Sequence, residues 1–115
     1  MQLQPEEEWR EDALLLELGT QLLAGEQRAF PPEPAEAVAA ARAWLKRQRA
    51  ELARRICPNE DVQKLVRGDR RSELAAAIAD LIAALCKGLP VFTVARLLVI
   101  YGIETLCAEQ WQPEG

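Results

Sequence analysis

The chain contains no histidine among its 115 residues. Histidine is the commonest general base, the usual partner of serine and cysteine nucleophiles, and a frequent zinc and haem ligand. The glycine-rich patterns that hold phosphates, GxxxxGK and GxGxxG, are also missing. These absences predict a non-enzymatic protein without catalytic, cofactor-binding or metal-binding residues. A carboxylate-based enzyme is the distant alternative.

Long apolar runs and paired cysteine motifs are lacking too. The longest mostly apolar run, residues 89–103, is interrupted by Arg96, whereas a membrane span needs roughly twenty apolar residues. The acidic start has neither the basic nor the apolar part of a secretory signal. Cys57, Cys86 and Cys107 are odd in number and widely spaced, with no CxxC pattern. We therefore expect three small buried hydrophobic residues rather than a disulfide or zinc site, in a cytoplasmic protein with no membrane partner.

Aromatic residues make up only 5% of the chain, and the 50% apolar fraction is mostly Leu and Ala. This composition favours helices over strands. Together with a charged fraction of 28%, it is typical of a globular domain, and the length fits one core. The predicted fold is all-α: a single compact bundle of five to six helices over residues 1–115, with 1–5 and 112–115 frayed.

Helix boundaries follow from proline, glycine and capping residues, which predict helices over 6–24, 34–56, 60–66, 72–87 (with Asp69 or Ser72 as the cap), 91–101 and 104–111. Residues 91–101 are rich in β-branched side chains and also fit a strand. The helical spacing of Val94, Leu97 and Leu98, and the lack of a partner strand, favour a helix. Between 74 and 86 the only charge is Asp80. We interpret that helix as buried nearly all round, with Asp80 at a solvated edge and Ala76, Ala83 and Ala84 on a face for close packing.

The first predicted helix carries apolar residues on two faces. Leu14, Leu15, Leu18 and Leu22 share one face, and Trp9, Ala13, Leu16 and Leu23 form another. Such a helix is either central in the bundle or shared between the core and a second copy, because monomers rarely expose large apolar patches. We expect a homodimer, with Glu17 near the basic helix of the other copy. On this view, Leu15→Glu with Leu22→Glu gives a folded monomer.

Charge is segregated along the sequence. Residues 1–36 hold nine acidic and two basic residues, a net charge of −7, whereas residues 37–73 hold ten basic and five acidic residues, a net charge of +5. Helix 34–56 carries most of this basic block, and between residues 42 and 55 only Glu51 opposes it: Arg42, Lys46, Arg47, Arg49, Arg54 and Arg55. Three interpretations compete: a solvated face, a surface complementary to an acidic protein, and a nucleic-acid backbone site. The overall charge of −4 counts against the third.

Two residues of this helix stand out. Trp44 falls on the face away from the Val38–Leu45–Leu52 stripe, where it is either a contact residue or a cap on the edge of the core. Arg49 falls within that stripe. It either lays its methylenes on the core and reaches outward to water, or is a partly buried ion-pair partner at an interface.

The favoured function is a protein–protein interaction or assembly domain, adaptor or regulatory, that binds itself or another protein. The alternative is a nucleic-acid-binding regulator that uses helix residues 42–55. Small helical bundles with segregated charge recur as assembly modules, including the death-fold type, an analogy at the level of the fold alone. The candidate interaction residues are Leu15, Glu17, Leu22, Arg42, Trp44, Lys46, Arg47, Arg49, Arg54 and Arg55.

Overall fold

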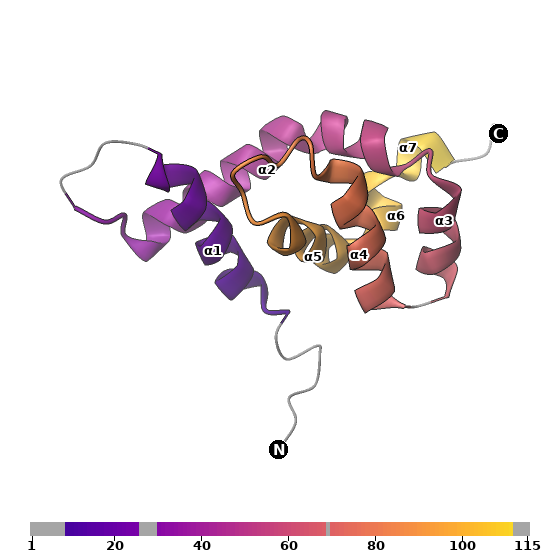
Figure 1. The fold of residues 1–115 in the computed structure, drawn as a ribbon, viewed down its shortest axis with the longest axis horizontal. Helices are drawn as coiled ribbons and strands as arrows, with labels where there is room; N and C mark the ends of the chain where they lie inside the picture. The colour runs from indigo at the N-terminus through magenta and orange to yellow at the C-terminus, as the bar shows by residue number, and fades with distance from the viewer. Residues whose placement is uncertain (1–8, 26–29, 69, 112–115) are drawn as a thin grey trace, which may run out of the picture.

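A computed structural model describes residues 9–25, 30–68 and 70–111. These residues form helices α1 (Glu11–Ala24), α2 (Pro34–Ile56), α3 (Glu60–Arg67), α4 (Arg71–Ile82), α5 (Val91–Tyr101), α6 (Ile103–Leu106) and α7 (Ala108–Trp111) (Figure 1). No strand occurs in the described ranges. The prediction of an all-α bundle is confirmed, and so is the helix over 91–101. The predicted helix start at Glu6, the frayed ends and the Asp69 cap lie outside the described residues.

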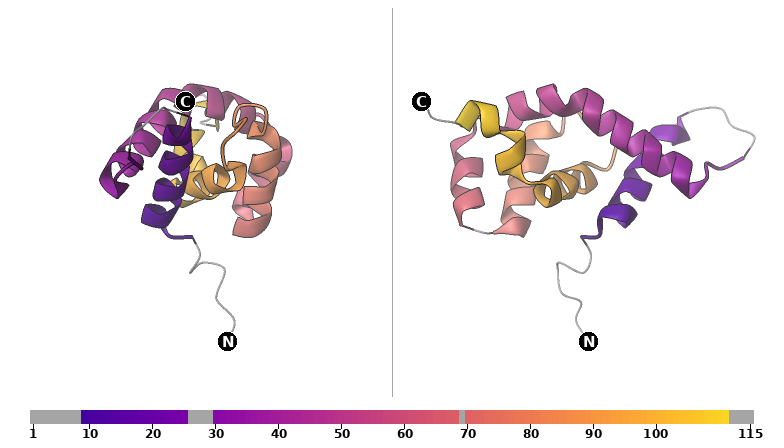
Figure 2. Two further views of the ribbon diagram at one scale, coloured as in Figure 1. Left: turned by 60° about the vertical axis from the view of Figure 1, so that its left-hand side comes forward. Right: turned by 180° about the vertical axis from the view of Figure 1, so that it is seen from behind.

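The long helix α2 is the spine of the bundle. It contacts α1 near its N-terminal end and α4 further along, while α5 packs against both α1 and α4 (Figure 1). Seen from behind, α5, α6 and α7 form a path that runs beside α2 toward its C-terminal end (Figure 2). The core lies where these helices meet, and its largest fully buried aliphatic side chains are Leu15, Leu18, Leu52, Ile56, Val62, Ile78, Ile82, Val94 and Leu97. None of the described helices is both long and apolar enough to cross a membrane.

Local signals in the sequence set several helix ends. Pro34 occupies the first turn of α2, where its missing N–H has no helical partner to lose. The Asn59 side chain accepts a hydrogen bond of 3.0 Å from the Val62 N–H and caps α3. Gly102 ends α5 with φ at +101°, a conformation that glycine adopts without the steric cost of a Cβ. This turn sends α6 back toward α2.

Helices α1 and α2 approach each other unusually closely at Gly19. A Cβ built on Gly19 would overlap the backbone carbonyl of Ala37 and lie 2.8 Å from the Ala37 Cα. Gly19 and Ala37 are both buried. The two backbones are therefore in direct contact, and only glycine fits on the α1 side of the crossing.

The two apolar faces of α1 lie in different environments. Leu14, Leu15 and Leu18 are buried, and the helix packs against both α2 and α5. Contacts within one chain therefore cover the first face, whereas Leu16 on the second face is 38% exposed. Leu15 is fully buried, so the expectation that it lies on an interface is wrong. A glutamate at position 15 would place a charge in the core and unfold the chain instead of releasing a monomer.

Helix α4 differs from its prediction in length and burial. It ends at Ile82, and turns occupy residues 83–88. Its buried residues form a single stripe that includes Leu74, Ile78 and Ile82. The expected close-packing face is wrong, because Ala76, Ala83 and Ala84 are exposed. Alanine is small enough to lie in water at little cost, so an alanine-rich face does not identify a contact. Asp80 is exposed, as predicted.

The cysteine prediction is wrong for two of the three residues. Cys57 and Cys107 form a disulfide, with their Cα atoms 5.5 Å apart and a sequence separation of 50. Cys57 follows α2 and Cys107 follows α6, and the turn at Gly102 brings these two ends together. No local spacing pattern reveals a pair separated by four helices. Cys86 is unpaired and buried, as expected. The disulfide removes the cysteine-based argument for a reducing compartment.

Candidate interaction surface

A groove runs between α2 and the α5–α6 corner. Its volume is about 220 Å³. Leu52 and Leu98, both buried, lie at its floor, and the half-buried Leu45 and Leu106 line its sides. The remaining lining residues are Lys46, Arg49, Tyr101, Gly102 and Thr105. A second hollow of about 560 Å³ shares Lys46, Arg49, Thr105 and Leu106 with the first and extends it toward α7. We call the two together the cationic groove.

The wall opposite α2 depends on covalent and hydrogen-bonded ties. Thr105 and Leu106 belong to α6, which has only four residues and is too short to be stable alone. The disulfide joins Cys107, the next residue, to the end of α2. The Trp111 indole N–H donates a hydrogen bond of 2.7 Å to the Cys57 carbonyl oxygen. These two ties hold the short C-terminal helices against the spine and so maintain the groove.

The structure divides the basic block of α2 into paired and unpaired cations. Arg54 and Arg55 form ion pairs of 3.0 and 2.9 Å with Glu51, and Arg42 lies 3.6 Å from Glu11. Within the described part of the chain, the other three cations of this block form no ion pair with a carboxylate. These three, Lys46, Arg47 and Arg49, are exposed and all line the cationic groove. The unpaired cations of α2 therefore lie beside an apolar floor.

Charge across the groove is asymmetric. The α2 wall supplies Lys46, Arg47 and Arg49, whereas the opposite wall supplies the neutral Thr105 and, toward α7, the acidic Glu109. A bound segment would therefore experience a positive potential on its α2 side and a neutral to negative one on the other. Such a gradient fixes orientation as well as sign of charge.

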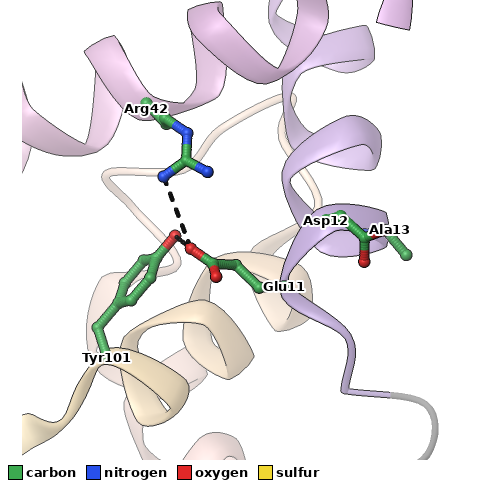
Figure 3. Close-up of polar contacts among 5 residues, drawn as sticks. All are labelled: Glu11, Asp12, Ala13, Arg42 and Tyr101. Atoms are coloured by element: carbon green, nitrogen blue, oxygen red, sulfur yellow. Dashed lines mark hydrogen bonds and ion pairs between the residues drawn. The ribbon is translucent and has the colours of Figure 1, made fainter. Parts of the chain in front are cut away.

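Three helices meet in a polar contact at one end of the groove (Figure 3). The Tyr101 hydroxyl of α5 donates a hydrogen bond of 2.7 Å to Glu11 Oε2 of α1. Arg42 of α2 lies 3.6 Å from the same oxygen. Burial first, and then the hydrogen bond to Glu11 and its negative charge, raise the pKa of Tyr101 to about 12, and the positive charge of Arg42 opposes this rise. The contact fixes the ring that lines the groove.

The raised pKa of Tyr101 is directly measurable, because the chain has one tyrosine. We expect tyrosinate absorbance of the folded chain to rise with a midpoint near pH 12, compared with about 10 for an exposed phenol. Glu11→Gln should lower the midpoint because it removes the charge, while burial keeps it above the ordinary value. The contribution of this group to stability is complete below about pH 10 and is lost as pH rises toward 12, because the folded state holds the proton more tightly.

The exposed Glu17 on the same helix provides the control, since Glu17→Gln should leave the midpoint unchanged. Circular dichroism recorded at each pH would establish that the helices persist through the titration. A Tyr101 midpoint that Glu11→Gln leaves unchanged would show that the Tyr101–Glu11 hydrogen bond does not form in solution.

The candidate residues from the sequence fall into distinct environments. Trp44 is 7% exposed and belongs to the core, so its assignment as a contact residue is wrong. The reason is that α2 contacts both α1 and α4 and so buries a wider arc than one stripe. Leu22 is half-buried against the core, and Glu17 is exposed. Arg49 is exposed beside Leu45 and Leu52, which agrees with the outward-reaching arrangement, one of the two predicted for it.

Sequence reasoning missed half of the groove. Tyr101, Thr105 and Leu106 belong to the opposite wall, and no motif marked them. It also missed the role of Trp9, whose ring is flanked by the guanidinium groups of Arg71 and Arg96 at 4.7 and 5.7 Å from the ring centre. These cation–π contacts attach the start of α1 to α4 and α5. These contacts form only when segments far apart in sequence are brought together by the fold, so no local pattern in the sequence indicates them.

The described residues offer few groups for chemistry. No cluster of three or more Cys, Asp or Glu residues there is arranged to hold a metal ion. Burial raises the pKa of the Cys86 thiol, and the charge of Arg55 opposes this only in part, so the thiol stays protonated and is a poor nucleophile. No protein-family model matches the chain, and no curated protein and no solved structure matches it either.

Proposed function

We propose that this chain is a non-enzymatic protein–protein interaction domain and that the cationic groove is its binding surface. The observation that supports this most directly is the combination of an apolar floor, formed by Leu52 and Leu98, with three cations that lack carboxylate partners among the described residues. An apolar core bordered by polar and charged residues is the usual anatomy of a protein-binding site. The groove is concave and offers both apolar and charged groups, which suits a protein partner that carries both kinds of side chain.

A nucleic-acid-binding regulator is the alternative, and the pairing of charges makes it less favourable. Backbone binding depends on the number of phosphates that cations neutralise. Arg42, Arg54 and Arg55 are already engaged with carboxylates, so α2 offers three cations instead of six. Phosphates also gain nothing from an apolar floor. A shallow salt dependence of binding to generic duplex DNA is therefore expected, and a steep one would favour the alternative.

Self-association was predicted because α1 has two apolar faces. Helices α2 and α5 cover the Leu14–Leu15–Leu18 face within one chain, whereas Leu16 of the other face is exposed. Self-association stays a prediction that sedimentation of the purified chain tests. The cationic groove does not include Leu16, and the partner proposed for the groove is another protein.

Site-specific photo-crosslinking in the native host would test the proposed function. A photo-reactive residue at Thr105, in the groove, should form a protein adduct that resists nuclease. The same residue at the exposed Asp80 of α4 provides the control and should not form it. Lys46→Glu with Arg49→Glu should abolish the Thr105 adduct. Equal adducts from both positions, or an adduct removed by nuclease, would contradict the proposal.

A further inference from the structure

We infer that the occupant of the cationic groove is an acidic amphipathic helix of another protein, with its carboxylates on the α2 side. This rests on the proposed function and assigns the chemistry of the partner. The sign of charge follows from Lys46, Arg47 and Arg49, which have no carboxylate partner in the described ranges. The apolar component follows from the leucine-lined floor.

The helical form of the partner follows from the walls of the groove. Both walls are helices, α2 on one side and α5–α6 on the other, and the backbone groups within a helix are bonded to each other. An extended segment would find few backbone partners there and would leave its own polar groups unsatisfied. A helix satisfies them internally and presents one apolar face to the floor, the mode of helix-in-groove recognition.

The orientation of that helix follows from the charge gradient across the groove. Its carboxylates would approach Lys46 and Arg49, while its other edge would pass the neutral Thr105 and the acidic Glu109. Glu109 then disfavours a helix that is acidic on both edges. The groove therefore selects for both the sign and the placement of charge.

Three synthetic helical peptides and the full chain would test this inference. The first carries leucines on one face with glutamates on one flank, the second replaces those glutamates with lysine, and the third distributes the same leucines around the helix. Fluorescence anisotropy should show binding of the first peptide, weakened by salt, at least about tenfold tighter than that of the other two. Equal or tighter binding of the lysine peptide would overturn the inference.

Variants of the chain locate the binding. Lys46→Glu with Arg49→Glu should weaken binding of the acidic peptide by about tenfold or more, because it reverses both charges. Lys64→Glu with Lys87→Glu makes the same change of net charge at exposed positions outside the groove and should have little effect. Glu109→Lys should tighten binding about two- to fivefold, because it removes a repulsion at the opposite wall. Equal losses from the two double variants would overturn the inference.

The remaining outcomes separate this inference from the proposed function. If the acidic peptide fails to bind while the Thr105 crosslink still forms, the groove has a partner of other chemistry, and only the inference is overturned. If sedimentation shows a dimer that Lys46→Glu with Arg49→Glu dissociates, a second copy is the occupant, and the inference is again overturned. If neither peptide binding nor the crosslink is observed, both are contradicted.

Discussion

Replacing Gly19 by alanine should destabilise the protein by about 3 kcal/mol or more, one of the largest effects expected of a single methyl group. The added Cβ would overlap the Ala37 carbonyl, and the neighbouring Cα would be only 2.8 Å away. Both are backbone atoms, so no side-chain rotation can relieve the overlap. Helices α1 and α2 would have to separate, which would also open the contacts of Leu15 and Leu18. Thermal unfolding should show a midpoint lower by roughly 10 °C or more.

Gly25→Ala is the matched control for this substitution. Gly25 follows the same helix, has φ at −79°, and has no atom within 4 Å of an added Cβ. The substitution adds the same methyl group and restricts the unfolded chain to the same extent. It should be neutral or stabilise by a few tenths of a kcal/mol. A similar loss of stability in both variants would show that the effect reflects glycine itself and not the close contact at Gly19.

Much of the fold could be predicted from local features of the sequence. Pro34, Asn59 and Gly102 mark helix ends by their own conformational and hydrogen-bonding properties, and the structure places helix ends at or beside them. The helix over 91–101 was favoured against a β-branched composition because its apolar spacing is helical. The periodicity was the better guide because this segment packs against α1 and α4. Burial of its apolar face outweighs the intrinsic preference of β-branched residues for strands.

Close contacts between helices could not be predicted in the same way. On a helical wheel, Gly19 is a gap beside two leucines, and its role becomes visible only once α2 crosses α1 at Ala37. Trp44 was misplaced for a related reason. A single stripe describes a helix with one neighbour, whereas α2 has several. Composition and period indicate which residues are apolar, but the number of neighbouring helices determines how wide an arc is buried.

The candidate site shows the same division between local and long-range information. The basic block was visible in the sequence, and the spacing of Glu51, Arg54 and Arg55 allows their pairing within one helix. The Glu11–Arg42 and Glu11–Tyr101 contacts join different helices, and no spacing rule finds them. Only after these pairs are assigned do Lys46, Arg47 and Arg49 emerge as the cations of α2 that are available to a partner. The count of charges in the sequence pointed to α2, and the ion pairs in the structure pointed to the cationic groove.

Removal of the Cys57–Cys107 disulfide should have the second large effect on stability. The bond closes a chain segment with a sequence separation of 50 residues, and the loop-closure entropy for that length corresponds to about 4 kcal/mol. We expect Cys57→Ala with Cys107→Ala to lower the free energy of unfolding by about this amount in a denaturant titration. Reductant should have a similar effect on the unmodified chain and none on the double variant.

Cys86→Ala is the control, because Cys86 is buried but unpaired. It should cost about 1 kcal/mol for the lost packing, and the variant should remain sensitive to reductant. Thiol titration of the chain unfolded without reductant should find one reactive group, and three after reduction. Three thiols before reduction would show that the disulfide is absent from the purified protein, and the double variant should then lose only the roughly 2 kcal/mol expected from truncating two buried cysteines.

The disulfide should also affect binding, because Leu106 of the groove wall directly precedes Cys107. Without the bond, α6 and α7 would be held mainly by apolar contacts and by the Trp111 hydrogen bond to Cys57. Helices of four residues do not persist alone, so amides of residues 103–111 should exchange with solvent much faster in the double variant. Affinity for the acidic helical peptide should fall together with that protection. Unchanged exchange in this segment would show that apolar packing alone maintains the groove wall.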